Sequence, residues 1–351
     1  MCDGHVDPHP HEPGHPHNHP TTLDRRSFLG LAAAGLGGIL LSSCRSGVGT
    51  ATTTSLVVPT ANSLSPKLEA TSSTLEVSSE TLAGFDAFAD SVKVFRDGQF
   101  WMVESNGMPN HNMMVGIKSW QQQFPLPQPY SGSNAWEIPA TPTMAEAPIS
   151  ARTALYRGAI AIAVNGVPIF NALNNRGDDA LLAGELDEWG GHCGRADDYH
   201  YHVAPLHLQE KTGGKPIAYA LDGYPIYGST EPDGSAVREL DEWNGHIDEG
   251  GRYHYHGTTT YPYINGGLVG IVQVSGDQIE PQPMTTPFRP PGEPLRGATI
   301  TGFRSPQTNH YELEYNLDGS TLSVAYVVDG SSVTFTFVDS TGSIRTETYT
   351  R

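Results

Sequence analysis

Six histidines recur in two blocks that have the same internal spacing. Residues 186–202 read LDEWGGHCGRADDYHYH, and residues 240–256 read LDEWNGHIDEGGRYHYH. Each block has a lone histidine followed, at the same distance, by Tyr-His-Tyr-His. In an extended segment alternate side chains share a face, so the two histidines of each Tyr-His-Tyr-His point the same way and can converge on one ion. The predicted ligand sets are His192, His200 and His202, and His246, His254 and His256.

Imidazole nitrogen suits zinc, copper, iron and nickel, and copper or zinc is the predicted ion. Three imidazoles with an open fourth position are typical of a reactive metal site. The pattern leaves open whether the two sets form two sites or meet in one. It also leaves open a structural interpretation, in which the histidines only support the fold through cross-strand contacts.

Other residues of the blocks are candidates for supporting roles. Metal-binding imidazoles usually donate their second N–H to a carboxylate or carbonyl, and an acidic pair stands in each block. Cys193 follows His192, whereas Ile247 follows His246, so a thiol is a possible extra ligand in the first copy alone and would favour copper. The predicted carboxylate partners of the imidazoles are Asp187, Glu188, Asp241 and Glu242.

The repeat begins before the histidine blocks. Residues 160–170 (IAIAVNGVPIF) match residues 217–227 (IAYALDGYPIY), fifty-seven positions later, while the histidine blocks are offset by fifty-four. Each unit therefore reads as an apolar strand, an Asn/Asp-Gly turn, a short strand, a loop of variable length and the histidine block. We expect two such units to pack around a pseudo-two-fold axis.

Few charged residues, many glycines and prolines and no long helical periodicity favour a mainly β protein. Clean alternation near the C-terminus, with turns at Asp318-Gly319, Asp329-Gly330 and Thr341-Gly342, predicts a small antiparallel β-meander of four or five strands. The predicted organisation is a signal at 1–44, a Ser/Thr-rich tether at 45–90, a duplicated domain at 91–275 with repeats at about 158–202 and 215–256, a Pro-rich linker at 276–296 and the meander at 297–351.

The first 44 residues have the features of an export signal. Arg25 and Arg26 form a twin-arginine pattern for export by the Tat translocon, and Leu41-Ser-Ser-Cys44 resembles a lipobox in which Cys44 is lipidated. A His-rich tract at 5–19 precedes the arginines. The expected location is the periplasm or cell surface, with a lipid anchor in a membrane.

The chain carries a formal net charge of -18. Such acidity repels phosphate backbones, which argues against nucleic acid as a partner. If Cys2 leaves with the signal and Cys44 is lipidated, Cys193 is the one remaining cysteine, so no disulfide is expected within the mature chain.

The paired YHYH blocks, the GH before each block, the segments NGVPIF and DGYPIYG and the earlier NGMPNH resemble the YHYH-domain family of exported proteins. The resemblance covers roughly residues 94–275. It implies a secreted or surface setting and supplies no catalytic residues.

Three classes of function remain open at this point. The chain can be a metal-dependent enzyme, a metal-handling lipoprotein, or an adhesion or carbohydrate-binding module in which aromatic side chains matter and the histidines are structural. The pattern assigns no substrate, catalytic residue or oligomeric state.

Overall fold

The computed structural model describes residues 82–351. Arg25, Arg26 and Cys44, the His-rich tract and most of the predicted tether lie outside these residues. Within them the protein is mainly β, as predicted, and no helix is long and apolar enough to cross a membrane. The short helices are η1 (Phe85–Phe88), η2 (Gly132–Asn134), η3 (Leu206–Leu208) and α1 (Gln209–Thr212).

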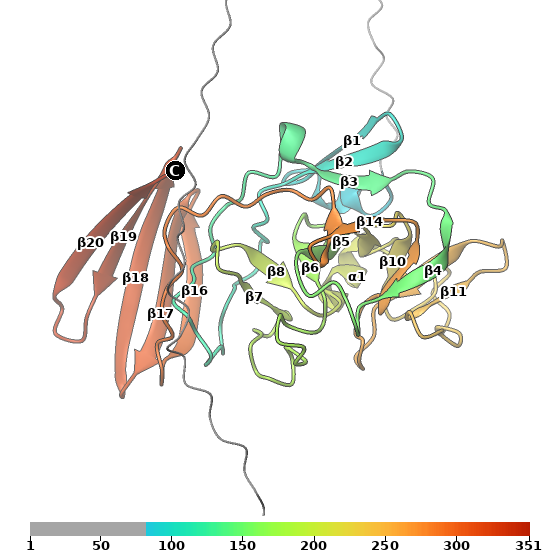
Figure 1. Ribbon diagram of the computed structural model, residues 1–351. Helices are drawn as coiled ribbons and strands as arrows, with labels where there is room; N and C mark the ends of the chain where they lie inside the picture. Colours follow the sequence, from blue (N-terminus) through green and yellow to red (C-terminus); the bar gives the residue numbers. More distant parts are fainter. Residues whose placement is uncertain (1–81) are drawn as a thin grey trace, which may run out of the picture. The chain divides into compact units, whose positions relative to one another are not determined.

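An eight-stranded sheet forms the centre of the fold (Figure 1). Its order is β11-β12-β10-β9-β5-β6-β8-β7, which is symmetric about the β9–β5 pair. The first repeat supplies β5 (Ala159–Ala163), β6 (Pro168–Phe170), β7 (Gly191–Cys193) and β8 (Tyr199–Tyr201). The second repeat supplies β9 (Ala218–Ala220), β10 (Pro225–Tyr227), β11 (Gly245–Ile247) and β12 (Tyr253–His256).

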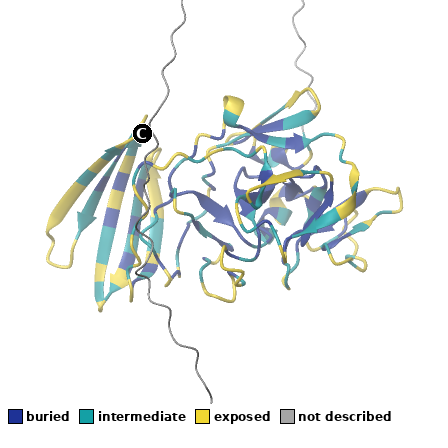
Figure 2. Ribbon diagram, viewed as in Figure 1, coloured by how far each residue is buried: buried dark blue, intermediate teal, exposed yellow. Residues whose placement is uncertain are grey.

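The two repeats meet in an antiparallel pair whose register shows the predicted pseudo-two-fold axis. Ile162 on β5 lies opposite Tyr219 on β9, its own counterpart in the other repeat. Ala161 and Ala163 pair with Ala220 and Ala218, the counterparts in reversed order. Every residue of both strands is buried (Figure 2), which explains the continuous apolar runs in the sequence.

Each repeat then makes the same connections. β5–β6 and β9–β10 are antiparallel hairpins, whereas β6–β8 and β10–β12 are parallel pairs. β7 and β11 close the two ends of the sheet, each antiparallel to its YHYH strand. The duplicated sequence therefore places one histidine block at each end of a single sheet.

Smaller sheets cover the central one. They are a three-stranded antiparallel sheet and two strand pairs. In the sequence, their strands come before the first repeat or after the second. Their strands are β1 (Lys93–Asp97), β2 (Phe100–Glu104) and β3 (Trp136–Pro139); β4 (Met144–Ser150) with β13 (Gly267–Gly270); and β14 (Gln273–Ser275) with β15 (Gln278–Glu280).

The predicted C-terminal meander is confirmed and has five strands in sequential order. Glycines at its three predicted turns have φ of 80°, 54° and 80°, a region that favours glycine. Tyr326 of this sheet donates a hydrogen bond from its hydroxyl to Pro125 O at 2.9 Å, which joins the meander to the rest of the described chain. The strands are β16 (Thr299–Gln307), β17 (His310–Leu317), β18 (Ser320–Asp329), β19 (Ser332–Val338) and β20 (Ile344–Thr350).

The described end of the predicted tether and the predicted Pro-rich linker both make specific contacts. Phe85 and Phe88 are buried, although the predicted tether extends to residue 90. In the predicted Pro-rich linker, the Arg289 guanidinium pairs with the buried Asp197 carboxylate at 2.7 Å and stacks over Phe124. Aromatic burial and one buried ion pair therefore fix both segments, which composition alone does not reveal.

Candidate metal centres

Strand pairing brings each predicted histidine set together. His192 on β7 lies opposite His200 on β8, and His202 follows on the same face of the chain. The second repeat does the same, because His246 on β11 lies opposite His254 on β12 and His256 is two residues further on. In each set the ring centroids form a nearly equilateral triangle with sides of 4.5–5.2 Å.

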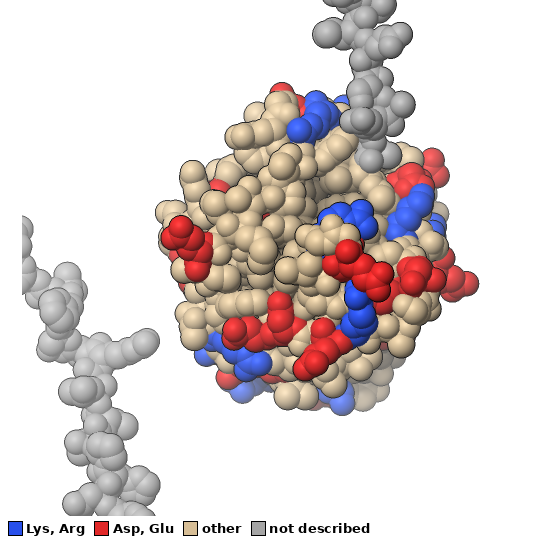
Figure 3. Space-filling view, turned by 90° about the vertical axis from the view of Figure 1, so that its right-hand side faces the viewer, with Lys and Arg blue, Asp and Glu red and all other residues tan. Residues whose placement is uncertain are grey.

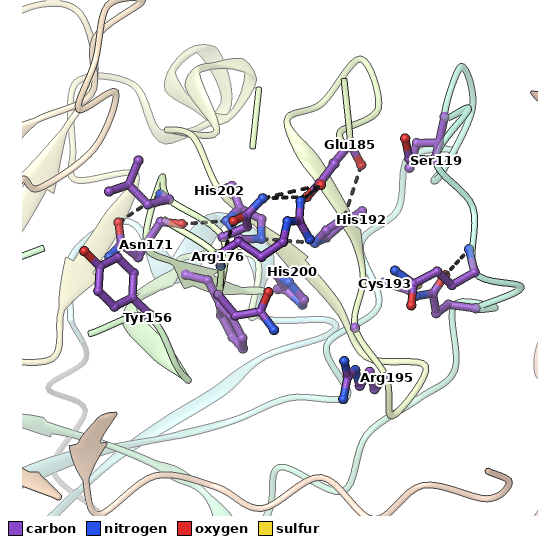
Figure 4. Close-up of a pocket in the computed structure, with 18 of the residues that line it drawn as sticks. Ser119, Tyr156, Asn171, Arg176, Glu185, His192, Cys193, Arg195, His200 and His202 are labelled. Carbon is purple, nitrogen blue, oxygen red and sulfur yellow. Dashed lines mark hydrogen bonds and ion pairs between the residues drawn. The ribbon is translucent and has the colours of Figure 1, made fainter. Parts of the chain in front are cut away.

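In the first cluster (His192, His200 and His202), backbone carbonyls fix the orientation of all three imidazoles. Their Nδ1 atoms lie 3.1 Å from Glu185 O, 3.0 Å from Asp198 O and 2.6 Å from Asn171 O, respectively. A carbonyl only accepts, so each Nδ1 carries the proton and each Nε2 presents a lone pair. The three imidazoles turn towards one another in Figure 4.

This orientation fits a cation at the centre of the first cluster. His192 Nε2 and His202 Nε2 lie 3.1 Å apart, yet neither has a proton to share when both Nδ1 atoms are protonated. Two facing lone pairs repel unless a positive charge lies between them. A tetrahedral zinc ion with Zn–N bonds of about 2.05 Å separates its nitrogens by about 3.3 Å, close to the distance present.

The second cluster contains a carboxylate as well as three imidazoles. Glu231 oxygens lie 3.3 Å from His246 Nε2, 3.4 Å from His254 Nε2 and 3.7 Å from His256 Nε2. His256 Nδ1 lies 2.9 Å from Gly228 O, while its Nε2 is buried without a hydrogen-bond partner. An orphaned buried nitrogen aimed at a carboxylate and two imidazoles is the arrangement that a bound cation satisfies. Thus His246, His254, His256 and Glu231 can hold a metal ion.

Glu231 is the residue that sequence reasoning missed. It lies in the loop after β10, and its counterpart in the first repeat is Asn174, fifty-seven positions earlier. The two loops have matching backbone hydrogen bonds: Glu231 N to Ser235 O at 3.0 Å, and Asn174 N to Asp178 O at 2.8 Å. Extending the repeat alignment into this loop would have placed a carboxylate in one copy and an amide in the other.

Asn174 does not replace Glu231 as a ligand donor. Its Oδ1 accepts hydrogen bonds from the backbone N–H groups of Arg176 and Asp178 at 2.9 and 3.1 Å. Its Nδ2 donates to the Glu185 carboxylate, which also pairs with the Arg176 guanidinium. Both ends of the Asn174 amide are therefore occupied by hydrogen bonds within the loop. The first cluster has three nitrogen ligand atoms, whereas the second has three nitrogens and one oxygen.

The first cluster opens into a cavity of about 260 Å³ with polar and charged side chains in its wall (Figure 4). Arg176 and Glu185 stand beside the imidazoles, and Arg195 lies further along the wall. Near the second cluster, a cavity of about 490 Å³ reaches His254. Its lining includes the aromatic and apolar side chains of Tyr224, Tyr227, Tyr253 and Ile247 and the charged residues Asp248 and Arg252.

The four predicted carboxylate partners lie elsewhere. Asp187 accepts hydrogen bonds from the Tyr199 hydroxyl and from the N–H groups of Met114, Trp189 and Gly191. Asp241 does the same for the Tyr253 hydroxyl and for the N–H groups of Trp243 and Gly245. Glu188 accepts from Asn112 Nδ2, and no side-chain hydrogen bond of Glu242 occurs within residues 82–351. Backbone carbonyls, Glu231 and Asp198, whose Oδ2 lies 3.5 Å from His200 Nδ1, contact the imidazoles in their place.

Cys193 is not part of the first cluster. Among residues 82–351, its thiol lies with neither of the two sets of possible ligand atoms. Its backbone N–H contacts Met114 Sδ at 3.2 Å, and burial raises the pKa of the thiol well above its ordinary value. Neighbouring residues of a strand face opposite ways, so His192 and Cys193 point to opposite sides of β7. The possible extra ligand is therefore absent from this site.

The tyrosine faces of the YHYH strands carry different hydrogen bonds in the two repeats. The Tyr201 hydroxyl lies 2.8 Å from His111 Nε2 and 3.0 Å from Asn165 Nδ2. In the second repeat the Tyr255 hydroxyl donates to Asp222 at 2.7 Å and accepts from Val269 N. His111 thus lies on the face opposite the first cluster and is not one of its nitrogens.

Burial keeps histidines of both clusters neutral. It lowers the pKa of His192 well below the ordinary value and the pKa of His202 to about 3, with further lowering by neighbouring imidazoles. The pKa values of His254 and His256 are also lowered by burial. Burial opposes ionisation of Glu231, but the Arg238 N–H and the imidazoles outweigh it and lower the pKa of the carboxyl. Neutral imidazoles and an ionised carboxylate are the forms that bind metals.

The clusters are separate sites. β8 and β12 are five strand spacings apart in the sheet, which at about 4.8 Å each corresponds to about 24 Å. One ion cannot be shared over that distance.

A protein-family model described as "YHYH protein" matches residues 135–239. This confirms the resemblance inferred from the motifs, over a narrower range than 94–275. The match includes the whole first cluster and Glu231 but ends before β12. Comparison of the chain with curated proteins and with solved structures finds no match.

We predict that His202 lowers the stability of the metal-free protein as the pH falls from 7 to 5, against the opposite effect of Asp197, whose pKa burial raises to about 6. The folded pKa of His202, about 3, lies below the unfolded value of about 6.5, so the unfolded chain binds more protons in this range. The expected loss from His202 is about 2 kcal/mol in the free energy of unfolding, and His192 adds to it. Urea unfolding in the presence of a chelator at pH 7, 6 and 5 measures this.

A His202→Gln variant should have a shallower pH dependence, whereas His310→Gln, on the C-terminal sheet, should keep the original slope. Equal slopes in His202→Gln and the unchanged protein would contradict the prediction.

Proposed function

We propose that this protein, which carries a YHYH domain at residues 135–239, binds one transition metal ion at each histidine cluster. The observation that carries the proposal is the orientation of the imidazoles. In the first cluster every Nδ1 faces a carbonyl and every Nε2 faces the centre, and in the second His256 Nε2 is buried without a hydrogen-bond partner.

The donor sets favour zinc or copper. Imidazole nitrogens suit both ions, and the absence of the Cys193 thiol from the clusters removes the argument that favoured copper in particular. We propose that both sites take the same ion and differ in how completely the chain surrounds it.

The two sites then serve different purposes. Glu231 completes four protein donors in the second cluster, as in closed structural zinc sites. The first cluster has three donors and a cavity beside it, and a metal with an open position there would polarise a bound molecule or activate water. We therefore propose a reactive or exchangeable ion in the first cluster and a structural ion in the second.

The setting of this activity is the cell envelope. Arg25 and Arg26 support export through the Tat translocon, and Cys44 supports a lipid anchor in a membrane. Export in the folded state suits a protein whose metal ions are bound before it leaves the cytoplasm. This part of the proposal rests on the sequence motifs alone.

A second candidate function is a ligand-binding module for carbohydrates or other ring compounds. The aromatic cavity beside His254 supports it, because tyrosine rings stack on flat ligands and no hydrogen bond of the Tyr224 or Tyr227 hydroxyl occurs within residues 82–351. In this alternative the histidines are structural and the protein is free of stoichiometric metal.

We predict two transition metal ions per chain in protein produced through its own export route. His200→Ala combined with His202→Ala should remove one ion, and His254→Ala combined with His256→Ala should remove the other, because the clusters are separate. Elemental analysis of the purified chains measures both. A metal-free unchanged protein would exclude this function and leave the ligand-binding module, and loss of both ions from either variant would contradict two independent sites.

We predict that one carboxylate decides which ion is open to solvent. In copper-loaded protein, the first ion should accelerate water-proton relaxation and Asn174→Glu should abolish this, because the substituted loop can place a carboxylate as the Glu231 loop does. Glu231→Asn should make the second ion accessible. Asn175→Glu adds the same charge one residue away and serves as the control; the same effect from it and from Asn174→Glu would refute the role of position 174.

We predict that Arg25→Lys combined with Arg26→Lys blocks export, because the Tat translocon reads the arginine pair. Cys44→Ser should release the exported protein from the membrane fraction. Immunoblots of fractionated cells follow both changes, with Arg45→Lys as the control next to the lipidation site. Normal export of the double-lysine variant would rule out the Tat route.

A further inference from the structure

The cavity over the first cluster carries one positive charge that the fold does not neutralise. Arg176 in its wall pairs with Glu185 and Asp178. Arg195 also lines the cavity and is exposed, and it forms no ion pair or hydrogen bond within residues 82–351. The three imidazoles of the cluster add no negative charge, whereas Asp198 places a carboxylate oxygen 3.5 Å from His200 Nδ1.

The second repeat has acidic residues at the positions that correspond to Arg176, Arg195 and Asn174. Asp233 is the counterpart of Arg176 with the offset of fifty-seven, and Glu249 is the counterpart of Arg195 with the offset of fifty-four. With Glu231 in place of Asn174, these three differences make the first cluster more positive than the second. Asp198, whose counterpart is Arg252, acts in the opposite direction. Figure 3, which faces the end with β4 and β11, shows acidic side chains over its lower and right parts, with basic side chains among them.

The positive charge near the first cluster contrasts with the acidity of the whole chain, whose formal net charge is -18. A divalent ion among three neutral imidazoles keeps its full charge, whereas Glu231 offsets part of it in the second cluster. The first cluster therefore combines an ion without a carboxylate ligand and an unpaired guanidinium. Such a site attracts anions.

The second repeat also indicates which kind of anion fits. Glu231 reaches the histidine centre with a carboxylate, and the first repeat has space at the corresponding place. A small molecule with a carboxylate would supply from outside the oxygen that Glu231 supplies from the chain.

We propose that the cavity of the first cluster binds a small organic carboxylate, with one carboxylate oxygen at the open metal position and the Arg195 guanidinium balancing the negative charge. This inference rests on the proposed metal occupancy of the first cluster, and it names the class of molecule on which that ion acts.

The test uses the full mature chain loaded with cobalt(II), with acetate as the probe and the visible absorption of the bound cobalt as the readout. Acetate should change the spectrum of one of the two cobalt ions. Asn174→Glu should remove the response, because the chain then fills the open position. Glu231→Ala should add a response at the second ion, which acetate can reach once the protein carboxylate is gone.

Arg195→Gln should weaken acetate binding by about fivefold, which is the size expected for a partly exposed charge pair. Arg195→Lys should restore most of the affinity, and Glu249→Gln, at the counterpart position, should leave it unchanged. Acetamide, which has the same shape without the charge, should bind much more weakly than acetate.

The outcomes separate the two proposals. Failure to bind cobalt would overturn the metal-binding function and this inference with it. Two bound cobalt ions with no response to acetate, equal binding of acetate by Arg195→Gln and the unchanged protein, or equal binding of acetamide and acetate would overturn this inference alone.

Discussion

The antiparallel pairing of β5 with β9 is the constraint on which the rest of the structure depends. Because Ile162 lies opposite its own counterpart Tyr219, every later strand of one repeat is related to its counterpart by the same axis. The strands therefore add outward in the same order on both sides. Each histidine block reaches one end of the sheet, where its edge strand, β7 or β11, has a single strand neighbour and a loop can close over the histidines.

Local interactions turn that symmetric frame into two well-defined clusters. Both faces of each YHYH strand are buried, so every polar group on them needs a partner. Tyr199 and Tyr253 find one in Asp187 and Asp241, which also organise the turn before the lone histidine. The imidazoles of the first cluster and His256 in the second find theirs in backbone carbonyls, which leaves their Nε2 atoms free. Rigid tyrosines on one face thus hold the imidazoles on the other.

Much of the fold and part of the site could be predicted from the sequence. Period-two alternation and Asp-Gly turns identified the meander, and the repeat placed His192, His200 and His202 together because strand spacing fixes their face. Glu231 was not found because its role depends on how a loop folds back over the sheet. The carbonyl partners were also missed, since a backbone oxygen leaves no sequence signal. The position of the Cys193 thiol away from the cluster could have been predicted, because its neighbour His192 faces the other side of the strand.

The second cluster joins segments that are otherwise weakly connected. Glu231 comes from the loop after β10, His246 from the three-residue edge strand β11, and His254 and His256 from β12. A short edge strand has a single hydrogen-bonded neighbour and frays easily. An ion at this place would act as a cross-link among residues 82–351, whose one cysteine, Cys193, is free, so that loss of the metal would expose the β10–β11 loop to proteases. The amount of intact protein would then follow the supply of the metal.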